Sequence, residues 1–163
     1  ASDSDEDLGN YACRLVVYVC NCTGLPTVFK GKMDTYIKVI LGERAKRVRT
    51  IRNGGEEPRW TAGTDPDAGE EVGWYTTRRL CSIKVEVWRD EQRFKGVEGH
   101  DSVDRLLCRT VVPVPEFIPP EQTGKGVESD LWNIDGQEAG KVKLRLLWRD
   151  PGEPARPIEL DLF

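Results

Sequence analysis

Strict alternation of apolar and charged side chains is the feature that most constrains the fold of this chain. In residues 82–88, Ile or Val alternates with Lys84 and Glu86, and in residues 141–148 Val or Leu alternates with Lys or Arg. A period of two places the apolar side chains on one face of a β-strand and the charged ones on the other. The pattern therefore predicts strands with one buried face.

The remaining segments fit the same class of structure. Turn signals separate short apolar runs, and no long helical periodicity interrupts them. The strands that we expect are 14–20, 36–41, 46–51, one that opens at Trp60 and resumes at Trp74 and Tyr75 after a polar loop, 82–88, 106–112, 141–148 and 157–163. This pattern predicts an all-β fold, an eight-stranded antiparallel β-sandwich. Residues 11–163 are expected to form a single domain that follows a disordered, acidic N-terminus, 1–10.

Charge is unevenly distributed along the chain. The formal net charge of −4 argues against nucleic-acid binding, which favours a basic footprint. Between residues 38 and 52, however, Glu43 is the only acidic residue among a set of basic ones: Lys38, Arg44, Lys46, Arg47, Arg49 and Arg52. A local basic patch on an acidic chain indicates contact with an anionic surface.

Enzymatic chemistry finds little support in the sequence. The single histidine, His100, lies in a loop rich in Gly and Asp, and no serine stands in a nucleophile motif. The 5 cysteines form no Cys-x-x-Cys pair, so we expect buried thiols rather than a zinc site. No apolar run is long enough to span a bilayer. We expect a cytoplasmic protein that is not an enzyme and needs no cofactor.

Four segments carry a resemblance to a known family: Met33–Gly42, Arg47–Ile51, Pro58–Trp60 and Val85–Trp88. Together they resemble the C2 domain, a β-sandwich that many proteins use to dock on membranes. The resemblance extends over about Leu15 to Trp148. The early first strand and a spare strand at the end imply the circular permutant typical of phospholipases.

The resemblance also implies that calcium is not bound. Calcium-binding members hold the ion with aspartates from loop 1 and loop 3, because calcium needs many oxygen ligands. Asp34 matches one of these aspartates, but Val28 stands at the position of another. In loop 3, Arg89, Glu91 and Arg105 occupy further ligand positions. Two arginines would repel the ion and pair with the remaining acids.

A shifted alignment of the long third loop would change this conclusion. The alternative set of calcium ligands is Asp34, Asp90, Glu91, Asp101 and Asp104. Loop 1 would still lack its first aspartate.

A lysine-rich groove on the concave strands, which binds phosphoinositides in the family, has partial counterparts in this chain. Lys38, Arg47 and Arg49 match its cations, Ile40 replaces one lysine, and Trp88 matches an aromatic residue beside the groove. Arg47 and Arg49 are two residues apart and should point the same way on a strand. Nearby charges that would add to the field are Arg44, Lys46 and Arg52. The alternative is a solvated strand face with no ligand.

Apolar residues among cations at two expected loop tips suggest a second kind of membrane contact. The residues are Val28, Phe29, Lys30, Lys32 and Met33 in loop 1, and Arg93, Phe94 and Lys95 in loop 3. Such loops can insert apolar side chains at the headgroup boundary while the lysines meet anionic lipid. Alternatively, Phe29 and Met33 fold back and cap the core.

These observations predict a non-catalytic, calcium-independent membrane-docking module. It would bind anionic phospholipid, either a phosphoinositide or phosphatidic acid, and bring a larger protein to the cytosolic membrane face in trafficking, exocytosis or signalling. Two alternatives remain open. The first is calcium-dependent lipid binding, and the second is a protein–protein interaction module that uses Trp74 and Tyr75 or the segment Pro113–Pro120.

Overall fold

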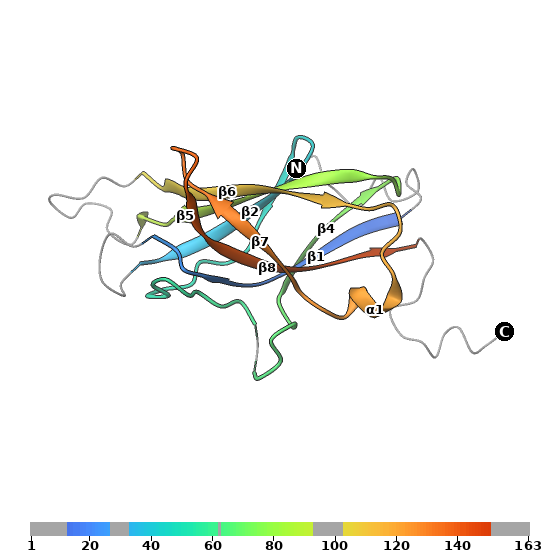
Figure 1. The fold of residues 1–163 in the computed structure, drawn as a ribbon, viewed down its shortest axis with the longest axis horizontal. Coiled ribbons are helices and arrows are strands. Elements are labelled where there is room, and N and C mark those ends of the chain that lie inside the picture. Colours follow the sequence, from blue (N-terminus) through green and yellow to red (C-terminus); the bar gives the residue numbers. More distant parts are fainter. Residues whose placement is uncertain (1–12, 27–32, 62, 93–102, 151–163) are drawn as a thin grey trace, which may run out of the picture.

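The computed structural model describes residues 13–26, 33–61, 63–92 and 103–150, which form eight strands and one short helix (Figure 1). The elements are β1 Cys13–Thr23, β2 Thr35–Leu41, β3 Arg44–Arg47, β4 Glu70–Thr76, β5 Cys81–Arg89, β6 Arg105–Val114, α1 Pro120–Thr123, β7 Val127–Trp132 and β8 Glu138–Arg149. Within these residues, no helix is long and apolar enough to cross a bilayer.

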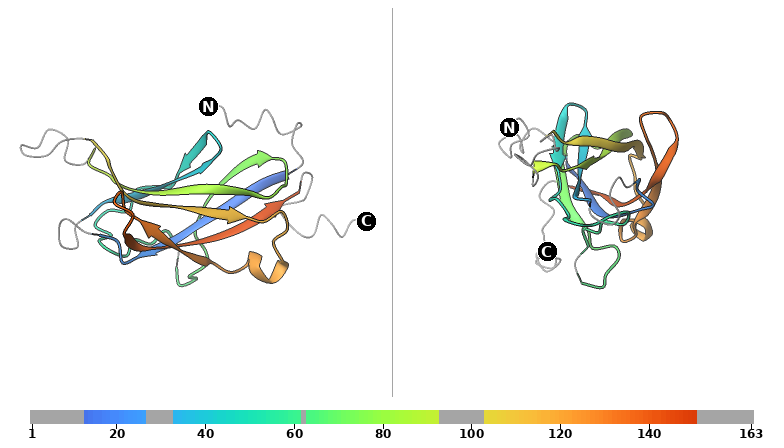
Figure 2. Two further views of the ribbon diagram at one scale, coloured as in Figure 1. Left: turned by 45° about the horizontal axis from the view of Figure 1, so that its top comes forward. Right: turned by 90° about the vertical axis from the view of Figure 1, so that its left-hand side faces the viewer.

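All strand pairs are antiparallel, and the strand order is β3-β2-β5-β6-β7-β8-β1-β4. The sheet folds over into two layers and nearly closes on itself (Figure 2). A single residue pair, Arg109 with Trp132, joins β6 to β7. At the other edge, Arg44 Nη1 of β3 donates to the carbonyl oxygen of Tyr75 in β4 at 2.9 Å. The predicted eight-stranded antiparallel β-sandwich is confirmed.

The core lies between the two layers and follows the alternation seen in the sequence. Ile83, Val85 and Val87 are fully buried, whereas Lys84 between them is exposed. Val142 and Leu144 of β8 face the same core. Burial of each such side chain stabilises the fold by about 1.5–3 kcal/mol. The inward and outward assignments for these two strands are confirmed.

Five predicted strands agree with the structure to within a few residues at each end. They are 14–20, 36–41, 82–88, 106–112 and 141–148, which correspond to β1, β2, β5, β6 and β8. The predicted buried thiols are also confirmed, with Cys81 only half-buried and the other four buried. Burial raises the pKa of each thiol, that of Cys108 to about 12.

The prediction of a strand that opens at Trp60 is wrong. Only an isolated bridge between Asn21 and Arg59 forms in this region. Trp60 donates its backbone N–H to Cys20 and its indole N–H to the carbonyl oxygen of Arg49 at 2.8 Å. Its side chain is buried in the core, so packing rather than strand pairing accounts for the aromatic residue here.

Two further boundaries differ from the prediction. The strand expected at 46–51 corresponds to β3, which spans Arg44–Arg47. Beyond β3 the chain still contacts β2, because the Val48 N–H donates to the carbonyl oxygen of Ile37 and Ile51 forms an isolated bridge with Thr35. β4 begins at Glu70 within the expected polar loop, and its acidic first residues pair with Val19 and Tyr18 of β1.

Sequence periodicity did not predict β7. Trp132 ends this strand with 43% of its surface exposed, whereas its neighbour Leu131 is buried. One residue of register decides which of the two faces the core. The predicted N-terminal segment 1–10 and the predicted strand 157–163 lie outside the described residues.

Candidate functional site

One row of side chains crosses five strands on the face of the sheet that points away from the core, hereafter the outer face. The ladders pair Arg47 of β3 with Lys38 of β2, Lys38 with Glu86 of β5, Glu86 with Arg109 of β6, and Arg109 with Trp132 of β7. Residues directly opposite one another in a ladder project on the same side. The fold therefore gathers three cations, one carboxylate and one indole from distant segments into one line.

The next row of the same face is aromatic. Tyr36 of β2 pairs with Trp88 of β5, and their rings are nearly parallel with centroids 6.5 Å apart. Lys38 Nζ lies 4.6 Å from the centre of the Trp88 ring, and Arg47 Cζ lies 3.6 Å from the centre of the Tyr36 ring. These four residues are called the aromatic-basic platform below. Each cation–π contact contributes about 0.5–1 kcal/mol at an exposed site, which orders the charged ends.

Asp104, the residue just before β6, holds Tyr36 of the platform in place. The Tyr36 hydroxyl donates to Asp104 Oδ2 at 2.7 Å, and the backbone N–H of Glu91 donates to Asp104 Oδ1 at 2.9 Å. Burial alone would raise the pKa of the Asp104 carboxyl. The hydrogen bonds outweigh burial and lower that pKa. Burial and the contact with Asp104 raise the pKa of Tyr36. At neutral pH an ionised carboxylate therefore holds a neutral phenol in place.

Arg47 has a second set of contacts besides the Tyr36 ring. Its Nη2 donates to the Thr50 hydroxyl at 2.8 Å, and that hydroxyl donates to Asp90 Oδ2 at 2.5 Å. The guanidinium is thus fixed from two sides while the residue remains exposed. A pre-ordered guanidinium loses little conformational freedom when it binds an anion.

The other predicted basic residues lie elsewhere. Arg44 and Lys46 alternate with Arg47 and are half-buried on the opposite face of β3. Arg49 follows the end of the strand, where its backbone N–H and guanidinium contact the carboxylate of Glu70 at 3.0 and 3.7 Å. The prediction that Arg47 and Arg49 lie on one strand is therefore wrong.

Arg52 lies at the base of loop 1 instead of on the platform. Its guanidinium is 3.6 Å from Oδ2 of the buried Asp34. Asp34 Oδ1 accepts the backbone N–H of Asn53 at 2.9 Å. The one aspartate that matches a calcium ligand in loop 1 is thus held by a cation and an amide.

At loop 3 an acidic residue is likewise held by an arginine. Arg89 and Glu91 form an ion pair at 2.5 Å, with 12% and 6% of their side-chain surface exposed. The expectation that arginine would pair with the remaining acids is confirmed at this pair. Over the described ranges, which omit Asp101, no three His, Cys, Asp or Glu side chains are grouped so that they could hold a metal ion.

Most of the predicted membrane-contacting loop residues cannot be compared with the structure. Val28, Phe29, Lys30 and Lys32, together with Arg93, Phe94 and Lys95, lie outside the described residues. Met33 is described and is 2% exposed within the core. The alternative interpretation, that the side chain caps the core, therefore holds for Met33. We remove Met33 from the residues proposed to touch a bilayer.

The sequence-based prediction missed the part that three residues play in this site. Asp104 was considered only as a calcium ligand, and neither Arg109 nor Trp132 was assigned to the basic face. Their positions depend on strand register, because Arg109 and Trp132 meet at the one pair that joins β6 to β7. A correct prediction of β7 would have placed Trp132 beside Arg109, which itself pairs with Glu86.

Comparisons with known proteins agree with this geometry. The sequence profile of the C2 domain matches residues 13–127, more than half of the chain. No curated protein sequence matches. The structure resembles a C2 domain of plant Extended Synaptotagmin 1, with a TM-score of 0.64 and 18% identity over 86% of this chain and 96% of that one.

Two larger proteins contain a similar fold. Human GIVD cytosolic phospholipase A2 matches with a TM-score of 0.57 and 11% identity over 87% of this chain, which spans only 18% of that enzyme. A structure of the SMP domain and two C2 domains of Extended-Synaptotagmin 2 matches with a TM-score of 0.54 and 16% identity over 93% of this chain and 33% of that one. The chain belongs to the C2 domain family, whose members serve as membrane-, lipid- or protein-interaction modules.

Proposed function

We propose that this chain is a non-catalytic C2 domain that docks on anionic phospholipid without calcium through the aromatic-basic platform. The observation that carries the proposal is the placement of Lys38 and Arg47 over the rings of Trp88 and Tyr36. In this arrangement two cations from adjacent strands are ordered side by side on the outer face.

The chemistry of the platform suits a phosphate-bearing headgroup. Arginine can bind two phosphate oxygens with its planar fork, and lysine adds a compact charge beside it. The indole N–H of Trp88 donates to Glu86 Oε1 at 3.0 Å, so Glu86 is itself held in the row. Its charge offsets one of the flanking cations, which favours a directed contact over unspecific attraction to any polyanion.

Independence from calcium is supported by the contacts of the acids at the loop end. Asp34 is engaged by Arg52 and Asn53, and Glu91 by Arg89. A calcium ion at this end would have to displace the largely buried Arg89 from Glu91. Removing one partner of a buried ion pair is strongly unfavourable, by about 3–5 kcal/mol in general.

The biological consequence would be recruitment of a larger protein to the cytosolic face of a membrane, and the headgroup would belong to a phosphoinositide or to phosphatidic acid. The test is co-sedimentation of the full chain with neutral vesicles and with vesicles that contain either lipid, each in calcium and in chelator. We expect binding to the anionic vesicles in both conditions, and the double variant K38E/R47E to lose at least tenfold in affinity.

The matched control is R79E/K125E, which changes the net charge equally at two exposed residues away from the platform. This variant should bind nearly as the parent does. Equal losses in both double variants would mean that total charge and not the platform drives binding. Binding should also fall as salt rises, because exposed charges are screened over about 8 Å at physiological ionic strength.

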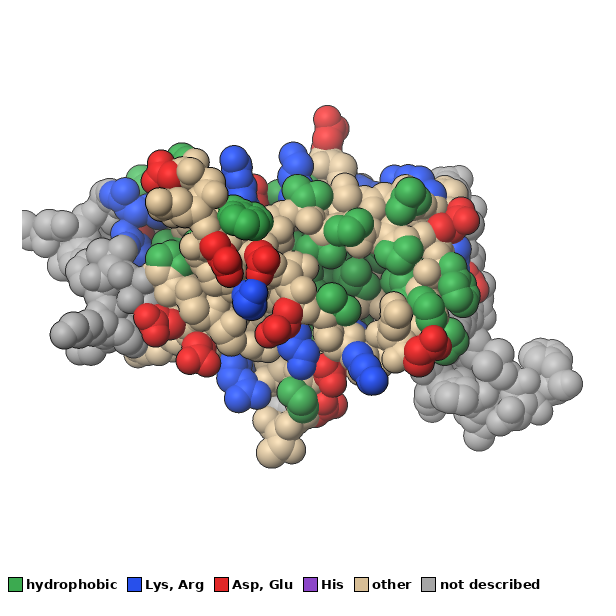
Figure 3. Space-filling model, viewed as in Figure 1, with side chains coloured by type: hydrophobic (Ala, Val, Ile, Leu, Met, Phe, Trp, Pro, Cys, Tyr) green, Lys and Arg blue, Asp and Glu red, His purple; other side chains and the backbone are tan. Residues whose placement is uncertain are grey.

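An apolar groove supports the second candidate function, a protein-interaction module. Hydrophobic side chains gather around a hollow to the right of centre in Figure 3. This groove, of about 230 Å³, lies between β6, α1, β7 and β8 and is lined mainly by Val112, Pro113, Pro115, Ile118, Val127, Leu144 and Leu146. It includes part of the Pro113–Pro120 segment that the sequence suggested, whereas Trp74 is fully buried.

The strand edges beside this groove favour an extended peptide as its ligand. After Arg109, β6 makes no ladder pair with β7 among the described residues, so both strands present an open edge there. An extended segment can add to such an edge while its apolar side chains fill the groove. Two exposed hydrophobic residues allow a test: Val127 lines the groove, and Phe117 precedes Ile118, which also lines it. A partner that is retained by K38E/R47E but lost by F117D/V127D would identify this surface. Loss in the first variant alone would exclude it.

A further inference from the structure

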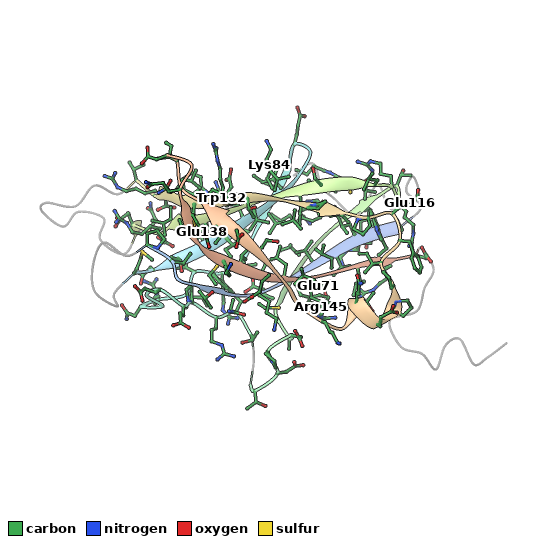
Figure 4. The ribbon with its side chains drawn as sticks, in the orientation of Figure 1. Glu71, Lys84, Glu116, Trp132, Glu138 and Arg145 are labelled. Carbon is green, nitrogen blue, oxygen red and sulfur yellow. The ribbon has the colours of Figure 1, made fainter. Side chains whose placement is uncertain are left out.

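A second basic site lies on the outer face, on the far side of Glu86 from the aromatic-basic platform. A groove of about 600 Å³ is lined by Lys84, Glu86, Arg109, Thr110, Val111 and Trp132 and is called the Trp132 groove below. Figure 4 labels Lys84 and Trp132, which lie in the region where β5, β6 and β7 approach one another. This groove has a larger volume than the apolar groove and differs from it in chemistry.

The cations of the groove are exposed and have no acidic partner in the described part of the chain. Lys84 and Arg109 both have exposed side chains, and neither forms an ion pair with any residue in the described part of the chain. Lys141 and Lys143 of β8, by contrast, pair with Asp130 and Asp67. Among the described residues, Glu86 is the only carboxylate that lines the groove, and Oε1 of Glu86 already accepts the indole N–H of Trp88.

The groove also offers an apolar wall. Trp132 and Val111 remain 43% and 59% exposed although both sit on a sheet whose other face is the core. Small-molecule sites commonly combine such apolar and aromatic surface with a few charged groups that fix orientation. A ligand that fits this wall carries an anionic group at one end and carbon-bound hydrogens or a ring at the other.

The groove and the platform are too far apart to share one phosphate. Arg47 and Arg109 are separated by three ladders in the row Arg47–Lys38–Glu86–Arg109. At a spacing of about 4.8 Å between strands, their backbones are about 14 Å apart. Lys38 leans toward Trp88, two residues after Glu86, whereas Lys84 lies two residues before Glu86. The two pairs of cations therefore diverge from Glu86.

We propose that the Trp132 groove binds a phosphate ester, with the phosphate between Lys84 and Arg109 and the organic part against Trp132 and Val111. This anion site is separate from the platform, and the proposal holds whether or not the platform binds lipid. The same chemistry is presented by a free phosphate ester and by a lipid headgroup, and the experiment distinguishes these two sources.

Two tryptophans make the test direct, because Trp88 reports on the platform and Trp132 on the groove. The indole N–H signals of the 15N-labelled full chain are assigned with W88F and W132F and followed during titration with glycerophosphate. We expect the Trp132 indole and the amides of residues 109–111 to shift with saturation. In K84Q/R109Q these shifts should weaken at least tenfold in apparent affinity, while the Trp88 signal responds as in the parent.

The reciprocal variant, K38Q/R47Q, should leave the Trp132 response intact. The proposal is overturned if glycerophosphate does not move the Trp132 signal, if the shift survives K84Q/R109Q, or if K38Q/R47Q abolishes it, since the last result would mean one site. Far-UV circular dichroism and urea unfolding of each variant ensure that a lost signal does not reflect unfolding.

Vesicles that contain phosphatidic acid, which is glycerophosphate with two acyl chains, identify the source of the ligand. A loss of vesicle binding in K84Q/R109Q would support a lipid headgroup in the groove. Unchanged vesicle binding together with glycerophosphate binding would support a free phosphate ester. Failure of platform-dependent vesicle binding would contradict the proposed function alone, because the Trp132 signal is measured without a membrane.

Discussion

Arg47 and Tyr36 are held in contact, with the guanidinium carbon 3.6 Å from the centre of the phenol ring. The hydroxyl of the same ring donates to Asp104 at 2.7 Å. The ring therefore links a cation on its face to a carboxylate at its edge, and this carboxylate lies at the start of β6 beside loop 3. Any change in loop 3 that moves Asp104 would be transmitted to the cation that is proposed to bind lipid.

Replacing Tyr36 with Phe tests this linkage. The ring and its contact with Arg47 are retained, but Asp104 loses a donor, which should cost about 1–3 kcal/mol because the acceptor is charged and partly buried. Urea unfolding measures the change. The control is Tyr75→Phe, since the Tyr75 hydroxyl has no hydrogen bond among the described residues. A loss in the control as large as in Tyr36→Phe would contradict the role assigned to the hydrogen bond.

The lowered pKa of Asp104 predicts how stability depends on pH. The unfolded chain titrates this group near its ordinary value of about 4, whereas the folded protein binds the proton only at lower pH. The contribution of Asp104 is therefore fully present above the unfolded value and is lost as pH falls toward the folded value. The parent should lose more stability between about pH 5 and pH 3 than Asp104→Asn does. Parallel pH profiles for the two proteins would refute this expectation.

Strand periodicity was sufficient to predict most of the sheet but not its register. Alternation at 82–88 identified which side chains face the core, because burial on one face imposes it. Trp60 was misassigned for a physical reason, since a tryptophan fits both a buried core and an exposed strand. Arg49 was placed on the basic face because β3 was expected to continue, whereas the carboxylate of Glu70, more than twenty positions away in sequence, holds it beyond the strand end.

Calcium should not stabilise the protein, because Asp34 and Glu91 already contact Arg52 and Arg89. A site with a dissociation constant one hundredfold below the calcium concentration would raise the free energy of unfolding by about 2.7 kcal/mol. We expect the Tm in calcium and in chelator to agree within about 1 °C. A clear rise in Tm with calcium would instead support the alternative ligand set that includes Asp101 and Asp104.

Replacing each cation of the platform with the other type of basic residue should change the affinity for vesicles unequally. Arg47 binds through a planar fork that stacks on Tyr36, so Arg47→Lys keeps the charge but loses the stacking and the bidentate geometry. We expect about three- to tenfold weaker binding to anionic vesicles. Lys38→Arg retains both charge and the contact with Trp88 and should bind within about twofold of the parent. Equal affinities for all three proteins would mean that charge alone is recognised.

The packing of β8 against the end of β1 depends on one glycine. Gly140 has a φ of +100°, and a Cβ atom there would lie 2.6 Å from the carbonyl oxygen of Thr23 and 2.9 Å from that of Gly24. Gly140→Ala should therefore combine backbone strain with a clash against backbone atoms and cost about 2–5 kcal/mol. The consequence is a weakened β1–β8 pairing at the loop end of the sheet, measured by urea unfolding.

Gly136 provides the matched control for that substitution. Its φ is +81°, so alanine is strained there as well, but apart from its chain neighbours no heavy atom of the described residues lies within 4 Å of the added Cβ. Gly136→Ala should cost only the backbone strain, about 1–3 kcal/mol. The difference between the two variants isolates the contribution of the close approach between β8 and the chain that follows β1. If Gly140→Ala is no more destabilising than Gly136→Ala, the strands separate easily at this point and the close approach contributes little to the fold.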